Sequence, residues 1–182
     1  MPYNYLIDYI LLDDGEITEP VTVEEAKNYC RVTTNADDQL ISDMITEARE
    51  AVEIATGLSL TNKLVEIWFN NGSGNFSIPY GPMKVDSFKL YDLQTGNEIT
   101  SQYYKLIGFA HPSLYFPNWT QLRATYRAGM DTIPKDLKIA ILDQIDYDYE
   151  NRGADIERYD QSGVCQKTWR ACQRYTRVSP IL

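Results

Sequence analysis

The chain has 182 residues, of which 43% are hydrophobic and 24% are charged, a balance typical of a folded protein. A chain of this length forms one domain, or one domain with an insertion. The net charge of −9 argues against non-specific DNA binding, because contacts to phosphate supply most of that affinity. Acidic side chains are concentrated in residues 1–60, whereas residues 161–182 hold 4 basic and no acidic side chains. An acidic head and a basic tail suit head-to-tail contact between copies.

Residues 1–18 form an N-terminal extension in which tyrosine and aliphatic side chains recur at every second position from Tyr3 to Leu11. A period of two predicts an extended strand. No partner strand follows nearby in the sequence, so we expect this strand to pair with a neighbouring copy of the chain. The stretch lacks a basic start and no apolar run reaches the length of a membrane span, so neither a signal peptide nor a membrane partner is expected.

Two helices are predicted next. Thr22 followed three residues later by Glu25 is a capping box, which opens the first helix. The second helix begins near Asp37 or Asp38, whose carboxylates suit the N-cap and the helix dipole. Gly57 ends it as a left-handed cap. One face of the second helix is apolar, at Leu40, Ile41, Met44, Ile45, Ala48, Val52 and Ala55.

Short runs of β-branched and aromatic residues follow, with turn signals between them. The glycine-rich residues 70–75 predict a hairpin turn, residues 94–97 predict a second tight turn, and the two prolines of residues 79–82 predict a break. We expect about six short strands, which include residues 64–69, 76–78, 85–93, 103–107, 114–116 and 121–126.

A third helix is predicted to open with Pro134 in its first turn and to end at Gly153. A short basic helix is predicted from Val164 to about Arg174. The pattern as a whole predicts an α+β fold, in which three main helices and a C-terminal arm or short helix form a small core and an antiparallel β domain is inserted. The expected parts are the 1–18 extension, the 19–60 helical hairpin, the 61–133 β domain, the 134–153 third helix and the 154–182 basic arm.

The carboxylates of Asp143, Asp146 and Glu150 are the strongest argument for an enzyme. Their spacing of i, i+3 and i+7 places them on one side of a helix, where they could converge on a metal ion. They also lie beside or opposite the apolar stripe of that helix, where a solvated acidic face is the simpler interpretation.

Other signals for catalysis are weak. His111 is the single histidine, which excludes a histidine pair. The glycines of residues 72–74 lack the Lys and the following helix of a phosphate loop. Cys30, Cys165 and Cys172 show no metal-binding spacing, so reduced cysteines are expected.

The C-terminal arm mixes basic and aromatic side chains. Trp, Tyr and Arg dominate binding hot spots, so we favour docking on an acidic protein surface. The same mixture suits nucleic acid, through stacking and phosphate pairing, although four bases are few for that purpose. The candidate docking residues are Trp169, Arg170, Arg174, Tyr175 and Arg177.

A series of short motifs carries a family resemblance. The motifs are PVTVEEAK at 20–27, RV at 31–32, DDQLI at 37–41, ARE at 48–50 and TG at 56–57. In this order and spacing they resemble the opening of tailed-phage head–tail connector proteins, the head-completion adaptors. The later turn at 78–85 and the third helix at 133–152 resemble that family too. The resemblance covers residues 19–153, and the aromatic extension and the C-terminal ending VSPIL depart from it.

The resemblance implies a structural protein, not an enzyme, without catalytic, cofactor-binding or metal residues. It implies a dodecameric ring of copies below the portal protein, which extends the DNA channel and offers a platform to a stopper or tail-completion protein. Genomic DNA would pass the acidic helices without sequence-specific binding, and the basic arm would reach the portal. The protein would lie in the virion neck, and in the host cytoplasm during assembly. From the residues alone, the alternatives are a metal-dependent hydrolase and a small nucleic-acid-binding module built on the β domain.

Overall fold

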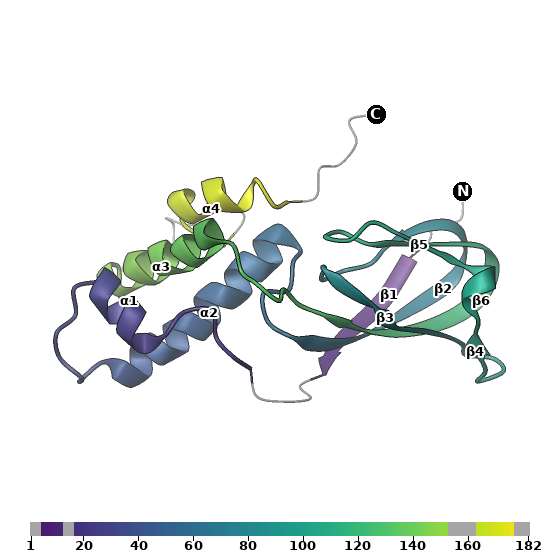
Figure 1. Ribbon diagram of the computed structural model, residues 1–182, viewed down its shortest axis with the longest axis horizontal. Helices are drawn as coiled ribbons and strands as arrows, with labels where there is room; N and C mark the ends of the chain where they lie inside the picture. Colours follow the sequence, from purple (N-terminus) through teal and green to yellow (C-terminus); the bar gives the residue numbers. More distant parts are fainter. Residues whose placement is uncertain (1–4, 13–16, 153–162, 177–182) are drawn as a thin grey trace. The chain divides into compact units, whose positions relative to one another are not determined.

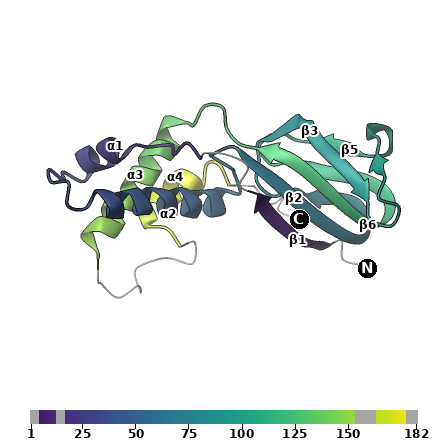
Figure 2. The same ribbon diagram turned by 90° about the horizontal axis from the view of Figure 1, so that it is seen from below.

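The computed structural model describes residues 5–12, 17–152 and 163–176, and it divides into two compact units. The β unit consists of the chain up to Ile17 and of Thr61–Met130, and the helical unit of Thr18–Leu60 and the chain from Asp131 onward. Figures 1 and 2 show the strands gathered in one unit and the helices in the other. The predicted α+β fold, with a β domain inserted among core helices, is confirmed.

The start of the helical unit follows local sequence rules. Helix α1 (Val23–Tyr29) opens with the predicted capping box. The Thr22 hydroxyl accepts from the backbone N–H of Glu25 at 3.1 Å, and the Glu25 carboxylate accepts from the N–H of Thr22 at 2.8 Å. Two of the four N–H groups that lack a helical partner at this end are therefore satisfied by side chains.

Helix α2 (Asp38–Thr56) begins and ends as predicted, but its N-cap side chain does not bond to the backbone of the helix. Asp37 occupies the N-cap position without a side-chain bond to the helix, and its carboxylate accepts from the Tyr149 hydroxyl at 2.7 Å instead. Gly57 ends the helix in the left-handed conformation with φ 70°, which confirms the predicted cap.

Helix α3 (Lys135–Glu150) is shorter than predicted. Pro134 occupies the N-cap and not the first turn. The helix stops at Glu150 because Asn151 folds back, with its side-chain amide donating to the Tyr147 carbonyl at 2.6 Å. Gly153, the predicted end, lies outside the described residues.

Helix α4 (Gln166–Cys172) lies within the predicted basic helix. The core of the helical unit is built from Ala26, Ile41, Ile45, Ala48, Val52, Leu137, Ala140, Ile141, Ile145 and Cys172.

The β unit is one antiparallel sheet with the strand order β1-β2-β6-β3-β4, and β5 pairs with a further part of β6. Figure 1 shows β2 and β6 as the long central strands. A short 3-10 helix, η1 (Ser101–Tyr103), precedes β5. The strands are β1 (Tyr5–Leu12), β2 (Lys63–Ser77), β3 (Met83–Asp92), β4 (Glu98–Ile99), β5 (Lys105–Ile107) and β6 (Ser113–Ala128).

The N-terminal strand was predicted correctly, but its predicted partner was wrong. Strand β1 pairs with β2 of the same chain, from Tyr5 opposite Asn70 to Leu12 opposite Leu64. The pairing joins segments separated by the two helices of residues 23–56, so it could not be recognised from neighbouring sequence. The other edge of β1 carries no strand among the described residues.

The predicted hairpin turn at residues 70–75 is also wrong, because β2 runs straight through it. The register steps from Gly72 opposite Trp119 to Gly74 opposite Phe116, which leaves one residue on β2 facing two on β6. One of those two is Pro117, which has no N–H to donate to the ladder and is tolerated in a sheet at a bulge. The glycines of β2 therefore accommodate a bulge in the partner strand.

The core of the β unit is mainly aliphatic, but aromatic rings pack together within it. The rings of Phe76 and Phe116 stack with centroids 4.4 Å apart, and Phe69 meets Phe76 edge-on at 5.1 Å. The buried Tyr126 hydroxyl donates to the Pro79 carbonyl. The predicted turn at residues 94–97 is confirmed, with the Gly96 N–H donating to the Asp92 carbonyl at 2.8 Å.

Gly81 lies in the predicted break, where the backbone of another loop passes closely. A Cβ atom on Gly81 would lie 1.7 Å from the Ala110 carbonyl oxygen. The absence of a side chain at Gly81 therefore allows the loop between β5 and β6 to pack against the segment that leads into β3.

We predict that Gly81→Ala lowers the free energy of unfolding by about 3 kcal/mol or prevents folding, because backbone must move to admit the methyl group. Gly96→Ala is the matched control. The φ of Gly96 is +73°, but no atom lies within 4 Å of an added Cβ. The only cost is therefore that of an alanine in the left-handed conformation, about 1 kcal/mol. Urea unfolding of both variants measures the difference. Equal losses would show that the close approach does not constrain the loop.

Candidate functional site

The C-terminal helix α4 is anchored on α3 by its buried side. The Thr168 hydroxyl donates to the Ala140 carbonyl at 2.9 Å, and Cys172 is fully buried. The side chain of Gln144 accepts from the Cys165 N–H at 2.7 Å. The basic segment is therefore fixed to the helical unit by contacts that orient its other face.

The structure brings together two of the predicted docking residues. The Tyr175 hydroxyl donates to Asp136 at 2.7 Å, and the Arg174 guanidinium lies 3.7 Å from the same carboxylate. Burial, and then the bond to Asp136, raise the pKa of Tyr175 to about 12. Trp169 is half-buried and Arg170 is exposed, while Arg177 lies outside the described residues. Arg170 thus presents its charge outward on a helix that is held in place.

Asp143 links α4 to α1 as well, a contact that the sequence did not predict. Its carboxylate is only 7% exposed and accepts from the Tyr29 hydroxyl and from the Lys167 ammonium group. The hydrogen bond to Asp143 is the main cause that raises the pKa of Tyr29 and also that of Lys167. The expected solvated acidic face is therefore wrong at Asp143, because α1 and α4 cover that side of α3.

The metal-site hypothesis gains no support. Asp143 is engaged by Tyr29 and Lys167, and Glu150 is exposed at the end of α3. Among the residues that the structure describes, no three His, Cys, Asp or Glu side chains are arranged to hold a metal ion. His111 lies half-buried in the loop before β6.

The cysteines are free thiols inside the helical unit. Cys30, Cys165 and Cys172 are all buried. Burial raises the pKa of Cys30 and of Cys172 to about 11, with Asp146 adding to the effect at Cys30. A thiol with so little thiolate reacts slowly, so a cysteine introduced on the surface would be modified first.

A buried ion network joins α2 to the segment that precedes α1 and to the segment that follows α2. Arg49 is 1% exposed, and its guanidinium donates to Glu19 at 2.9 Å and to Glu53 at 2.8 Å. The other oxygen of Glu53 accepts from the Leu60 N–H at 2.7 Å. The ion pair could have been predicted from the sequence, since Arg49 and Glu53 are four residues apart and adjoin the apolar stripe at Ala48 and Val52.

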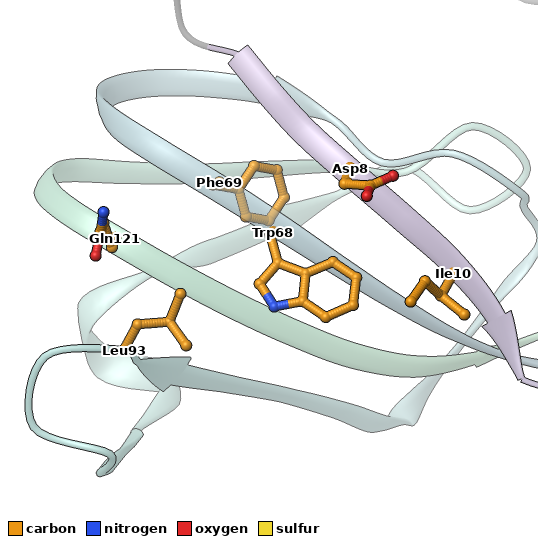
Figure 3. Close-up of a pocket in the computed structure, with 6 residues that line it drawn as sticks. All are labelled: Asp8, Ile10, Trp68, Phe69, Leu93 and Gln121. Carbon is orange, nitrogen blue, oxygen red and sulfur yellow. The ribbon is translucent and has the colours of Figure 1, made fainter.

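A hollow of about 410 Å³ opens on the β unit. Alternation along β2 directs Ile67 and Phe69 into the core and Trp68 to the opposite face. Figure 3 shows the Trp68 ring between Ile10 of β1 and Leu93, which follows β3. Asp8 and Gln121 add polar groups to an otherwise apolar lining. The hollow could not be predicted from the sequence, because its residues come from four separate segments.

The Head completion protein family model matches residues 19–160, and the chain belongs to that family. Membership of this family supports the role of a head–tail connector, a structural component of a virion. It supports neither a hydrolase nor a nucleic-acid-binding module.

Solved structures share the fold over nearly the whole chain. A chain in the neck of an empty gene transfer agent particle, computed with C6 symmetry, has 18% identity and a TM-score of 0.68, with 96% of this chain and 98% of that chain covered. A chain in the virion of a native gene transfer agent particle has 17% identity and a TM-score of 0.65, with 94% and 97% covered. A chain in the neck of the native particle, computed with C12 symmetry, has 15% identity and a TM-score of 0.61, with 92% and 98% covered. No curated protein matches the chain.

The described helices include none that is long and apolar enough to cross a membrane.

We predict that Arg49→Ala lowers the free energy of unfolding by about 3–5 kcal/mol, because the Glu53 carboxylate stays buried without its cation. Arg170→Ala serves as the control, since loss of an exposed side chain changes stability by no more than about 0.5 kcal/mol. Urea unfolding followed by circular dichroism measures both. The network would be irrelevant to stability if the two variants unfolded at the same urea concentration.

Proposed function

We propose that the chain forms a ring, of twelve copies, that docks on the portal protein and extends its DNA channel. The observation that carries the proposal is membership of the Head completion protein family, and the symmetric particle necks that contain chains of the same fold add to it. The far side of the ring would receive a stopper or tail-completion protein. The ring would assemble in the host cytoplasm and would lie in the neck of the finished virion.

We assign portal docking to the exposed face of α4 and to the segment that follows it in the sequence. The residues proposed for this contact are Trp169, Arg170, Arg174, Tyr175 and Arg177. Arg170 is the best single test, because its side chain is exposed whereas Tyr175 and Arg174 also hold Asp136. Deletion of the whole segment would be a poor test, since Cys172 and Thr168 are part of the core.

The exposed side of α2 suits the wall of the channel. Asp43, Glu47 and Glu50 are all exposed and follow one another at i, i+4 and i+7 along the helix. A negative wall would repel the phosphates of passing DNA and so prevent it from binding. A reconstruction of the ring in which this side of α2 faces away from the bore would overturn the placement.

We predict that Arg170→Glu weakens binding to isolated portal at least tenfold, a loss of about 1.4 kcal/mol, because a hot-spot cation is replaced by an anion. Lys135→Glu is the matched control, as it makes the same charge reversal at an exposed position on α3. Affinity is measured by biolayer interferometry at physiological salt. Equal affinities for the two variants would remove α4 from the portal contact.

A further inference from the structure

The β unit carries an apolar hollow that no described part of the chain covers. Its walls, Ile10 and Leu93, remain 45% and 43% exposed. Trp68 lies between them, as Figure 3 shows, and lines the same hollow. Exposed apolar surface around an aromatic floor marks an interaction site on a soluble protein.

The same unit presents a protruding aromatic side chain. Phe109 is 70% exposed in the loop between β5 and β6, and Ile107 beside it is exposed as well. The loop is held after Phe109, because Ala110 lies against Gly81 and the Pro112 carbonyl accepts from the Ile78 N–H at 2.9 Å. A side chain on a fixed loop loses little conformational entropy when it is buried by a partner.

Phe109, here called the knob, and the hollow lie at opposite ends of β3. Ala110 adjoins Gly81, two residues before β3 begins at Met83, whereas Leu93 follows the last residue of β3. Met83 lies opposite Ala128 of β6 and Asp92 opposite Leu122, so at about 3.3 Å per residue of β6 the two ends of β3 are roughly 20 Å apart. Phe109 therefore cannot fill the hollow of its own chain.

Two different surfaces that complement each other on one chain produce a heterologous contact between copies. Such a contact, repeated from copy to copy, closes into a ring when the rotation allows. Charge agrees with this pairing, since exposed Lys105 lies on the strand leading to Phe109 and exposed Asp8 lines the hollow.

We propose that, in the ring, Phe109 of each copy inserts into the Trp68 hollow of the next copy. This inference rests on the ring of the proposed function and names the contact that joins its subunits. The hollow takes the aromatic ring between Ile10 and Leu93, and Lys105 of the inserting copy approaches Asp8 of the receiving copy.

Cross-linking tests the contact directly. Leu93→Cys and Ile107→Cys, the second of which leaves Phe109 in place, are prepared separately and mixed with each other and with portal, and the rings are treated with a short bis-maleimide. The natural cysteines are buried, so the introduced ones react first. We expect covalent dimers only from the mixture, and a ladder of higher oligomers from the double variant. Dimers from either single variant alone would indicate a symmetric contact and overturn the proposal.

The outcomes separate this inference from the proposed function. Rings that form on the portal but do not cross-link would overturn the knob-and-hollow contact and leave the connector role intact. Absence of rings under the microscope would overturn both. Cross-links from Leu93→Cys to a different virion protein would show that the hollow receives that protein and not a second copy.

A matched pair of truncations gives an independent measurement. Phe109→Ser is expected to lower the yield of rings on portal at least tenfold while the melting temperature of the isolated chain stays unchanged. Tyr103→Ser, which removes another exposed aromatic side chain of the β unit, should leave the yield unchanged. Equal ring yields for the two variants would contradict the proposal.

Discussion

The buried guanidinium of Arg49 is the constraint on which the helical unit depends. It binds Glu19, which precedes α1, and Glu53, whose carboxylate also accepts from the N–H of Leu60 at the exit toward β2. The Arg49–Glu53 pair of α2 thus holds both the segment that leads into the unit and the segment that leaves it. A buried cation is tolerated there because two carboxylates neutralise and hydrogen-bond it.

The two units contribute different surfaces to one assembly protein. The helical unit fixes a basic helix on α3 through Thr168 and leaves Arg170 free to face a partner. The β unit relies on the long pairing of β2 with β6, which supports an apolar hollow at one end of β3 and the Phe109 loop at the other. A connector needs such separate surfaces, because it must meet its own copies as well as the neighbouring components of the neck.

Local rules in the sequence predicted the helices well, whereas contacts distant in sequence determined what was missed. The capping box at Thr22 and the left-handed cap at Gly57 depend on a few adjacent residues, and both were predicted. The predicted hairpin at residues 70–75 failed because β2 continues through those residues and pairs with β6, which lies far along the chain. Asp143 was assigned to a solvated face because its partner Lys167 lies on another helix. The order of short motifs still predicted the family, since a family pattern does not require knowledge of the pairings.

The most direct test of the account is electron microscopy of the purified chain mixed with portal, with symmetry determined from the images. The account predicts a closed twelvefold ring on one face of the portal, coaxial with its channel, with α4 against the portal and the acidic side of α2 toward the bore. A portal that remains bare, or one that binds scattered single copies away from the channel axis, would contradict the central claim that this chain is a ring-forming connector.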